Sequence, residues 1–531
     1  MPVFLPSRRH LLKTFGAAAA TALSLPALGK ERAGIAQEPY LDYPFQLGVA
    51  SGDPWPDGFV IWTRVAPRPL EPGFGMPKVP VEVSWDVAAD ESFKTIVAQG
   101  TKAAFPELGH AVHVELSGLE PGRDYFYRFT AGGYRSPRGR ARTAPAAGAP
   151  TDRVRFGVAG CQDYEQGLYT AYRHLSREPL DFVFHYGDYI YEGWANKATY
   201  LSRYTNQEEA KPRRLLLPES ISLDDYRLRY GHYKSDPDLQ AAHAAAPWVT
   251  VWDDHEVDNN WVGDLDSRDT PPEVFLLRRV AAAQAYYEHM PLRRSSWPLG
   301  SAIQLYRRLS FGDMLDLHVL DTRQYRDEQP CGDDFKAGCA DRMRASAQVL
   351  GQKQEAWLLD GLAASKARWN GLAQQIMVMT LARTPDAEPL RNMDSWEGYA
   401  DARRRLVKGV EERKRRNVVV LTGDEHQGYA GEIRRDDRDP TSAPVMTEFV
   451  ATSISSGGDG GEQRPLTPAL LQKNPHVKLI NDQRGYLVCD LSRDRWEAEF
   501  KVLDQVSRPG GTLSTRAKFA VEPDRPGLNG A

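Results

Sequence analysis

Long apolar runs are missing from this chain of 531 residues, apart from one short segment near its start. A membrane-spanning helix needs about 20 consecutive apolar residues, so we expect no stable membrane anchor. A surplus of positive charge is missing as well, because 67 Lys and Arg stand against 71 Asp and Glu, for a net charge of -4. Without a basic excess to hold a nucleic-acid backbone, we expect no nucleic-acid partner.

Cysteine is scarce too, with 4 residues, which excludes a scaffold built from disulfides. Cys331 and Cys339 lie in a polar loop that contains glycine, where they could form a local disulfide in an oxidising compartment. Cys489 ends a short apolar run and is interpreted as a buried strand residue. The motifs HExxH, CxxC and GxSxG are absent, so a zinc protease, a zinc ribbon and a serine hydrolase find no support.

The N-terminus carries an arginine pair, Arg8 and Arg9, followed by a small apolar segment over residues 15–28. This order resembles a twin-arginine export signal, since the apolar part is too short to cross a bilayer and ends in small residues typical of a cleavage site. We predict a signal peptide over residues 1–36 that engages the twin-arginine export machinery. The mature protein is then expected in the periplasm or outside the cell.

Two domains are expected from the length and the pattern of the chain. Residues 41–143 contain short runs of alternating apolar and polar residues, separated by turn signals such as Glu120-Pro-Gly122, which predict a small antiparallel β-sandwich. Residues 144–153, rich in Ala, Pro and Gly, are typical of a linker. Beyond them, apolar strands alternate with helical patterns, which predicts an α/β domain over residues 154–520.

Residues with ligand chemistry follow five apolar strands of this second domain. Because functional groups in an α/β sheet gather outside the carboxyl ends of its strands, we expect these residues to converge on one polar site. The acidic stretch Trp252–Trp261 is flanked by tryptophans, and buried carboxylates must pair or bind a cation, which favours a metal centre over a simple turn. The strand ends are followed by Gly160–Gln162, Gly187–Glu192, Asp253–Asp258, Asp321–Tyr325 and Thr422–His426.

The types of candidate ligand indicate a mixed metal site. Carboxylates favour hard cations such as Ca²⁺ or Mg²⁺, whereas a thiolate and a phenolate favour a transition ion. Cys161 and Tyr191 occur beside Asp188, Asp253 and Asp424 in this set.

Five motifs in the same order resemble the PhoD family of secreted alkaline phosphatases, and the likeness extends to at least Arg484–Tyr486. The resemblance implies a calcineurin-like metallophosphoesterase αββα sandwich, preceded by the small antiparallel β-sandwich. It also implies Fe³⁺ and Ca²⁺ as cofactors and small phosphate esters as substrates. The motifs are Gly48–Pro54, Gly187–Glu192, Trp252–Val257, Leu320–Arg326 and Gly423–His426.

The resemblance also implies roles for individual residues. Asp188 lies where metallophosphoesterases place a carboxylate that bridges two metals. His255 and His426 are catalytic candidates that would contact phosphate or orient a neighbouring carboxylate. The implied metal ligands are Cys161, Asp188, Tyr191, Asp253, Asn260 and Asp424.

The chain departs from the family in the segment Tyr233–Asp236, where the family usually has an arginine that would contact the substrate phosphate. This chain has Lys234. Lysine keeps the charge but loses the bidentate geometry of arginine. We predict a catalytic role for Lys234, and a lysine without any role remains the alternative.

The function implied is hydrolysis of phosphate monoesters, with diesters left open, by a metal-bound water or oxide as nucleophile. One alternative is a phospholipase D-like phosphodiesterase that acts on lipid headgroups. Another is a non-catalytic binding protein that uses metal only for stability. A structural ion would have a closed ligand shell, whereas a catalytic ion keeps an open position.

Overall fold

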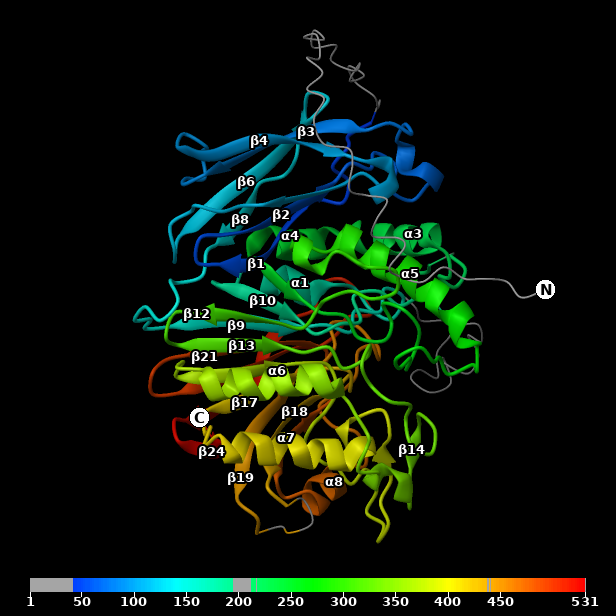
Figure 1. Ribbon diagram of the computed structural model, residues 1–531, viewed down its shortest axis with the longest axis vertical. Helices are drawn as coiled ribbons and strands as arrows, with labels where there is room; N and C mark the ends of the chain where they lie inside the picture. The colour runs from blue at the N-terminus through cyan, green and yellow to red at the C-terminus, as the bar shows by residue number, and fades with distance from the viewer. Residues whose placement is uncertain (1–41, 194–211, 216, 437–438, 440, 531) are drawn as a thin grey trace, which may run out of the picture. The chain divides into compact units, whose positions relative to one another are not determined.

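A computed structural model describes residues 42–193, 212–215, 217–436, 439 and 441–530. The export signal predicted over residues 1–36 lies outside the described residues. Two large sheets form the α/β part of the chain, and a smaller sheet of five strands belongs to the N-terminal part (Figure 1).

The first large sheet has ten strands and joins the N-terminal part to the α/β part. Its centre consists of three parallel strands that are buried almost throughout, as expected for strands covered on both faces. In order across the sheet, the strands are β24 (Arg525–Gly530), β23 (Leu513–Glu522), β22 (Trp496–Leu503), β21 (Gly485–Leu491), β9 (Val154–Ala159), β10 (Phe182–His185), β11 (Trp248–Thr250), β1 (Val49–Trp55), β2 (Gly58–Arg64) and β5 (Ala111–Glu115).

The second large sheet has seven strands, of which the four central ones are parallel and the outer ones antiparallel. In order, they are β12 (Arg307–Phe311), β13 (Leu315–Val319), β15 (Trp369–Ala373), β17 (Val418–Thr422), β19 (Pro444–Val450), β18 (Gly428–Arg434) and β20 (Val477–Asn481).

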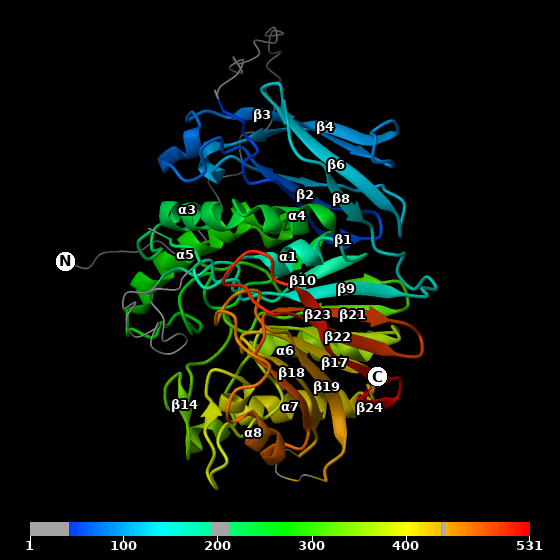
Figure 2. The same cartoon turned by 180° about the vertical axis from the view of Figure 1, so that it is seen from behind.

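The two large sheets pack face to face, and helices cover their outer faces (Figures 1 and 2). Phe182 stacks on Phe311 of the opposite sheet with ring centroids 4.5 Å apart, and Trp496 meets Trp369 edge-on at 5.9 Å. The predicted αββα sandwich is therefore confirmed. The helices beside the first sheet are α1 (Thr170–Leu175), α3 (Leu223–Lys234), α4 (Pro237–Ala245) and α5 (Pro272–His289), and those beside the second are α6 (Gly351–Ala364), α7 (Ala400–Glu412) and α8 (Thr467–Lys473).

The N-terminal part forms the antiparallel β-sandwich that the sequence predicts. Its outer sheet packs on β1, β2 and β5 through a core that includes Val83, Tyr127 and Phe129. The predicted linker, residues 144–153, lies in the connection between β8 and β9. The outer strands are β3 (Val81–Ala88), β4 (Ile96–Ala104), β6 (Asp124–Ala131), β7 (Tyr134–Arg135) and β8 (Gly139–Arg142).

One sheet of this sandwich continues directly into the α/β part, which the sequence does not indicate. Strand β1 pairs in parallel with β11, and Gly52 lies opposite Trp248. A Cβ at Gly52 would lie 2.4 Å from the carbonyl oxygen of Pro291, so only glycine allows this close approach. The N-terminal part is thus joined to the catalytic fold by main-chain pairing.

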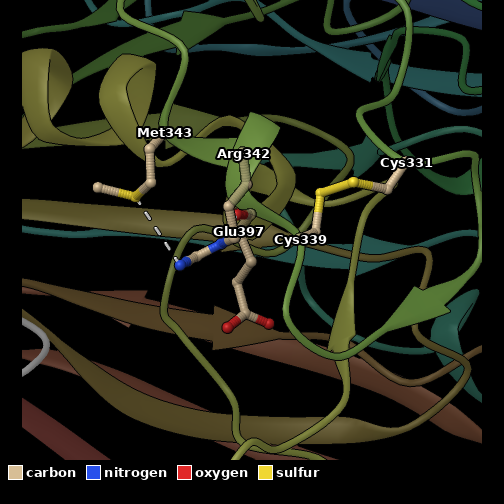
Figure 3. Close-up of a disulfide and its surroundings, with 5 residues drawn as sticks. All are labelled: Cys331, Cys339, Arg342, Met343 and Glu397. Carbon is tan, nitrogen blue, oxygen red and sulfur yellow. Dashed lines mark hydrogen bonds between the residues drawn. A yellow bond between two sulfur atoms is a disulfide. The ribbon is translucent and has the colours of Figure 1, made fainter.

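Cys331 and Cys339 form a disulfide, as the sequence suggests (Figure 3). The loop that it closes contains β14 (Phe335–Lys336), which pairs with β16 (Arg391–Asn392). Beyond the disulfide, Arg342 donates a hydrogen bond to the carbonyl oxygen of Glu397. Within the described residues, no helix combines the length and the apolar character that crossing a membrane requires.

Candidate metal centre

Four strands of the two sheets end at one polar site. Strand β9 leads to Cys161, β10 to Asp188, β11 to Asp253 and β17 to Asp424. Non-glycine residues rarely adopt left-handed main-chain conformations, and such strain collects at functional sites. Positive φ angles occur at Cys161 (50°), Asp188 (54°), Asn260 (54°), Asp424 (65°) and His426 (54°).

The side chains of these strand ends form a buried cluster with the spacing of metal ligands. Asp188 and Asp254 each belong to two of three overlapping groups, and within each group the potential ligand atoms lie within 4.8 Å of one another. Asp188 and Asp254 are therefore the residues that link neighbouring groups. The groups are Cys161, Asp188 and His426; Asp188, Asp254 and His255; and Asp253, Asp254 and Asp424.

Several oxygens of the cluster have no hydrogen-bond partner although they are buried: Oδ1 of Asp188, Oδ2 of Asp253 and Oδ1 of Asp254. Burial, together with the charge of the neighbouring Asp254, raises the pKa of Asp188 to about 7. Burial and neighbouring carboxylates hold the pKa values of Asp253 and Asp424 well above their usual range. Buried carboxylates clustered in this way require compensating positive charge, so the donor set fits a metal centre.

The Cys161 side chain also fits a metal centre. Burial raises its pKa well above the usual value, and the charges of Asp188 and Asp424 raise it further. A cysteine ligates metals as the thiolate, which is stable at such a position only beside a cation.

The fifth strand end contributes a positive charge to the cluster instead of a ligand. Asp321, after β13, accepts hydrogen bonds from the main-chain N–H groups of Arg323 and Gln324, so it stabilises its own turn. The fully buried Arg323 donates from Nε to Oδ1 of Asp253 at 2.5 Å and from Nη1 to Oδ2 of Asp394 at 2.9 Å. This fifth strand end therefore meets the other four through Arg323, which provides part of the compensating charge.

Tyr191 lies inside the cluster. Its hydroxyl donates to Oδ2 of Asp188 at 2.9 Å and lies 3.1 Å from Nε2 of His426. Ser456 donates to the Tyr191 oxygen at 2.6 Å, and its main-chain N–H donates to the carbonyl oxygen of Cys161 at 3.3 Å. The glycine-rich loop that begins at Ser455 therefore packs on the cluster and holds Tyr191 in place.

Asn260 connects the cluster to the disulfide loop. Its main-chain N–H donates to Oδ2 of Asp254 at 2.7 Å. Its side-chain Nδ2 donates to the carbonyl oxygen and to Oδ2 of Asp333, at 3.2 and 3.3 Å. Asp333 lies between Cys331 and Cys339, so the covalent bridge and a candidate ligand belong to one hydrogen-bonded segment.

The two candidate catalytic histidines lie in the cluster, and their pKa values are shifted in opposite directions. Burial alone lowers the pKa of His255, but Glu192, whose Oε2 lies 2.7 Å from Nδ1, and the nearby Asp254 raise it well above its usual value. Burial, together with the charge of Arg484, lowers the pKa of His426 to about 3. His255 therefore stays protonated and can donate to an anion, whereas neutral His426 has a nitrogen lone pair for a cation or a proton.

Lys234 is not brought to the cluster. Its side chain is 2% exposed at the end of α3, and Nζ lies 4.2 Å from the ring centroid of Trp62 and 5.2 Å from that of Tyr189. Burial lowers the pKa of this amine well below its usual value. The described geometry encloses the Lys234 amine between Trp62 of β2 and Tyr189, and it gives no support to a contact with the substrate phosphate.

Several residues of the site were not singled out by the sequence. Glu256 accepts main-chain N–H bonds from Asp188 at 3.1 Å and Asp253 at 2.8 Å, so it orients two candidate ligands. Asp254 and Glu256 are part of the acidic stretch after β11, so a signal for them was present. Asp394, the buried partner of Arg323, lies just after the two-residue strand β16, outside the five strand ends that the sequence indicates.

Two packed mixed sheets with a buried acidic cluster at their strand ends, behind an antiparallel β domain, define a metallophosphoesterase-like protein. The chain belongs to the PhoD-like phosphatase family: the phosphatase family matches residues 156–500, and the family of its N-terminal domain matches residues 30–145. The predicted family, fold class and enzyme class are thereby confirmed.

Individual relatives agree with this assignment. Alkaline phosphatase D of Bacillus subtilis (strain 168) is 47% identical over 489 residues, which cover 92% of this chain and 82% of that protein. A solved structure described as the structure of PhoD is 46% identical, covers 93% of each chain and has a TM-score of 0.89.

Proposed function

We propose that the protein hydrolyses phosphate monoesters outside the cytoplasm, with Fe³⁺ and Ca²⁺ as cofactors. The observation that carries the proposal is the set of buried, unpartnered carboxylate oxygens on Asp188, Asp253 and Asp254 in a chain of the PhoD-like phosphatase family. A protein that used metal only for stability would not need the polar side chains of His255 and His426 beside its ions.

Ligand chemistry suggests how the residues divide between the ions. Cys161 and Tyr191, together with Asp188, would hold the transition ion, because thiolate and phenolate are ligands for such ions. Asp253, Asp424 and Asn260 would hold Ca²⁺ through oxygen. When bound, these cations supply charge neutralisation for the transferring phosphoryl group and an activated water.

The remaining groups of the site would bind and orient the ester. His255, kept protonated by Glu192, would donate a hydrogen bond to a phosphate oxygen as negative charge develops there. Arg484 donates from Nη1 to the carbonyl oxygen of His426 at 2.6 Å, which would fix the His426 turn against the cluster. Asn260, held by Asp333, would keep its oxygen toward the cation.

The location outside the cytoplasm is supported by the arginine pair of the N-terminus and by the disulfide between Cys331 and Cys339, which is stable in oxidising compartments. The twin-arginine export machinery would be the partner for transport.

The test is turnover of p-nitrophenyl phosphate and of bis(p-nitrophenyl) phosphate by purified protein whose iron and calcium have been quantified. We expect monoester turnover in the unaltered protein and a loss of at least about 100-fold in Asp253→Asn, on the scale of removing electrostatic stabilisation. The exposed Asp524 provides a matched Asp→Asn control. Faster turnover of the diester would favour the phosphodiesterase alternative. An inactive protein with both ions bound would contradict the proposal.

A further inference from the structure

A cavity of about 400 Å³ lies beside the second large sheet, which is a size typical of small-molecule sites. It is bounded by α7, β18, the end of α8 and the segment before β16. Figures 1 and 2 both draw α7, α8 and β18 together at the end of the α/β part that is farther from β3 and β4. The described residues that line this cavity include no member of the acidic cluster, so it is separate from the metal centre.

Cationic side chains dominate the lining of the cavity. Four of them, Arg391, Arg403, Arg434 and Lys473, line it beside one carboxylate, that of Glu432, and the carboxylate of Glu397, which is not part of the lining, pairs with Arg391. Guanidinium groups offer planar pairs of donors that match the oxygens of phosphate, and lysine adds a mobile charge. The lining therefore favours an anionic ligand.

The cationic groups differ in how they are held. The Arg403 side chain is 3% exposed and donates from Nε to the carbonyl oxygen of Val378 at 2.6 Å, which fixes its guanidinium in the wall. Nη2 of Arg434 lies 3.4 Å from Oε2 of Glu432. Lys473 is exposed at the end of α8, and in the described part of the chain no carboxylate lies within ion-pair distance of it. Arg403, whose guanidinium is fixed, and Lys473, whose side chain can adjust, thus line the same cavity.

The wall that contains Asn474 and His476 is held by hydrogen bonds and lies near two arginines. Asn474 is buried and exchanges two hydrogen bonds with the main chain of Ala382, at 2.8 and 2.9 Å. A ring nitrogen of His476 lies 2.7 Å from the carbonyl oxygen of Thr380. Burial lowers the pKa of His476, and the charges of Arg434 and Arg403 lower it further. The charges of Arg434 and Arg403 thus act on this wall of the cavity.

We propose that this cavity binds a phosphate group, as free phosphate or as the phosphate of a small organic ester, at a site distinct from the metal centre. A phosphate group carries about 1.5 to 2 negative charges at neutral pH, which suits several cations better than a single carboxylate does. The volume leaves room beside the phosphate for an organic part, which Pro389 and Pro475 would contact. The proposal does not depend on the catalytic function.

The test is equilibrium dialysis of the full-length, metal-loaded protein against labelled orthophosphate. We expect two bound phosphates per chain, one at the metal centre and one in the cavity. Lys473→Gln and Arg434→Gln should each weaken one of the two sites about tenfold or more, as expected for loss of a charge-assisted contact. The matched control is Lys408→Gln, on α7, whose side chain is 75% exposed outside the cavity and which should leave both sites unchanged.

A second arm replaces orthophosphate with phenylphosphonate, which a phosphatase cannot hydrolyse. Tighter binding of the phosphonate at the site sensitive to Lys473 would identify an ester as the ligand, and tighter binding of orthophosphate would identify free phosphate. Phosphate binding that neither substitution weakens, or no phosphate binding at all by the unaltered protein, would overturn the proposal. Because Lys473 is exposed, its substitution tests the cavity even if Arg434→Gln fails to fold. Absence of monoester turnover would contradict the proposed function and leave this binding result intact.

Discussion

Single side chains of the candidate metal centre serve three different purposes. Cys161, Asp188 and Asp253 present ligand atoms, Arg323 balances part of their charge, and Glu256 holds the main chain of the ligand turns. These purposes differ in chemistry, so substitutions at them should differ in effect. A changed ligand should alter metal content first, whereas a changed support should alter stability as well.

Cys161→Ser should lower the iron content and the activity of the protein, since a hydroxyl is a poor substitute for a thiolate as a ligand of a transition ion. The two side chains have similar size, so we expect the fold to persist. The measurement is elemental analysis beside turnover of a monoester. Cys489→Ser provides a matched control, because Cys489 is equally buried but lies in β21 outside the cluster. Full iron occupancy in Cys161→Ser would remove this residue from the ligand set.

Lys234→Met should stabilise the protein at neutral pH by about 1 kcal/mol, because it removes a buried amine that no carboxylate in the described residues neutralises. Burial lowers the pKa of Lys234 in the folded state below its usual value of 10.5, so between these two pKa values the unfolded chain binds more protons. The free energy of unfolding of the unaltered protein therefore rises with pH between the folded-state pKa of Lys234 and 10.5.

The advantage of Lys234→Met should consequently shrink as the pH approaches 10.5, which urea unfolding at several pH values would measure. The Michaelis constant for a monoester should not change, since the side chain is enclosed against Trp62. A tenfold rise of that constant, without loss of metal, would restore Lys234 as a phosphate contact.

Among the structural elements, the disulfide loop has the most direct connection to the metal centre. Asp333 lies inside the loop and accepts hydrogen bonds from the Asn260 side chain. The same loop carries β14, whose partner β16 immediately precedes Met393 and Asp394. Local unfolding of this loop should therefore displace both the candidate ligand Asn260 and Asp394, the partner of Arg323.

Replacing Cys331 and Cys339 together by Ser should lower the free energy of unfolding by about 2 to 3 kcal/mol, the value expected for a short closed loop. It should also weaken calcium binding, because Asp333 would no longer be held beside Asn260. Calcium titration of the double variant measures the second effect. Asp333→Ala, with the disulfide intact, should reproduce the weaker calcium binding without most of the loss of stability. Equal calcium affinity in all three proteins would disprove the connection.

For the molecule as a whole, the shared sheet makes the N-terminal part a component of the catalytic fold. Besides the β1–β11 pairing, Trp62 donates from Nε1 to the carbonyl oxygen of Glu288 at 2.9 Å, and Arg307 donates from Nε to Oδ1 of Asp53 at 2.9 Å. These contacts cover one edge of the α/β sheet, and an uncovered edge strand promotes aggregation.

A chain that begins at residue 144 should therefore be insoluble or aggregated when it is produced without the N-terminal part, because β11 would become an open edge strand. Soluble yield and size-exclusion chromatography measure this outcome. The full-length chain is the reference, and production of residues 42–143 as a separate, co-expressed segment should rescue solubility. A soluble, active fragment from residue 144 onward would show that the two parts fold independently.

The sequence by itself determined the family, the order of a β domain before an α/β domain, and most residues of the cluster. These depend on local information: alternation of apolar residues shows strands, and Asp188, Asp253 and Asp424 each follow the carboxyl end of a strand, where functional groups gather in α/β sheets. The disulfide could also be predicted from the sequence, because its two cysteines are only 8 residues apart.

Only the tertiary structure decided which charges oppose one another and where the sheets join. Asp394 meets Arg323 across 71 positions, and Asp333 meets Asn260 across 73, so no local pattern marks either contact. The sequence could not separate a phosphate contact from a buried amine at Lys234, because that choice depends on Trp62, which lies in another domain. Burial and long-range charge pairing arise only when distant segments pack, so they became visible only in the folded chain.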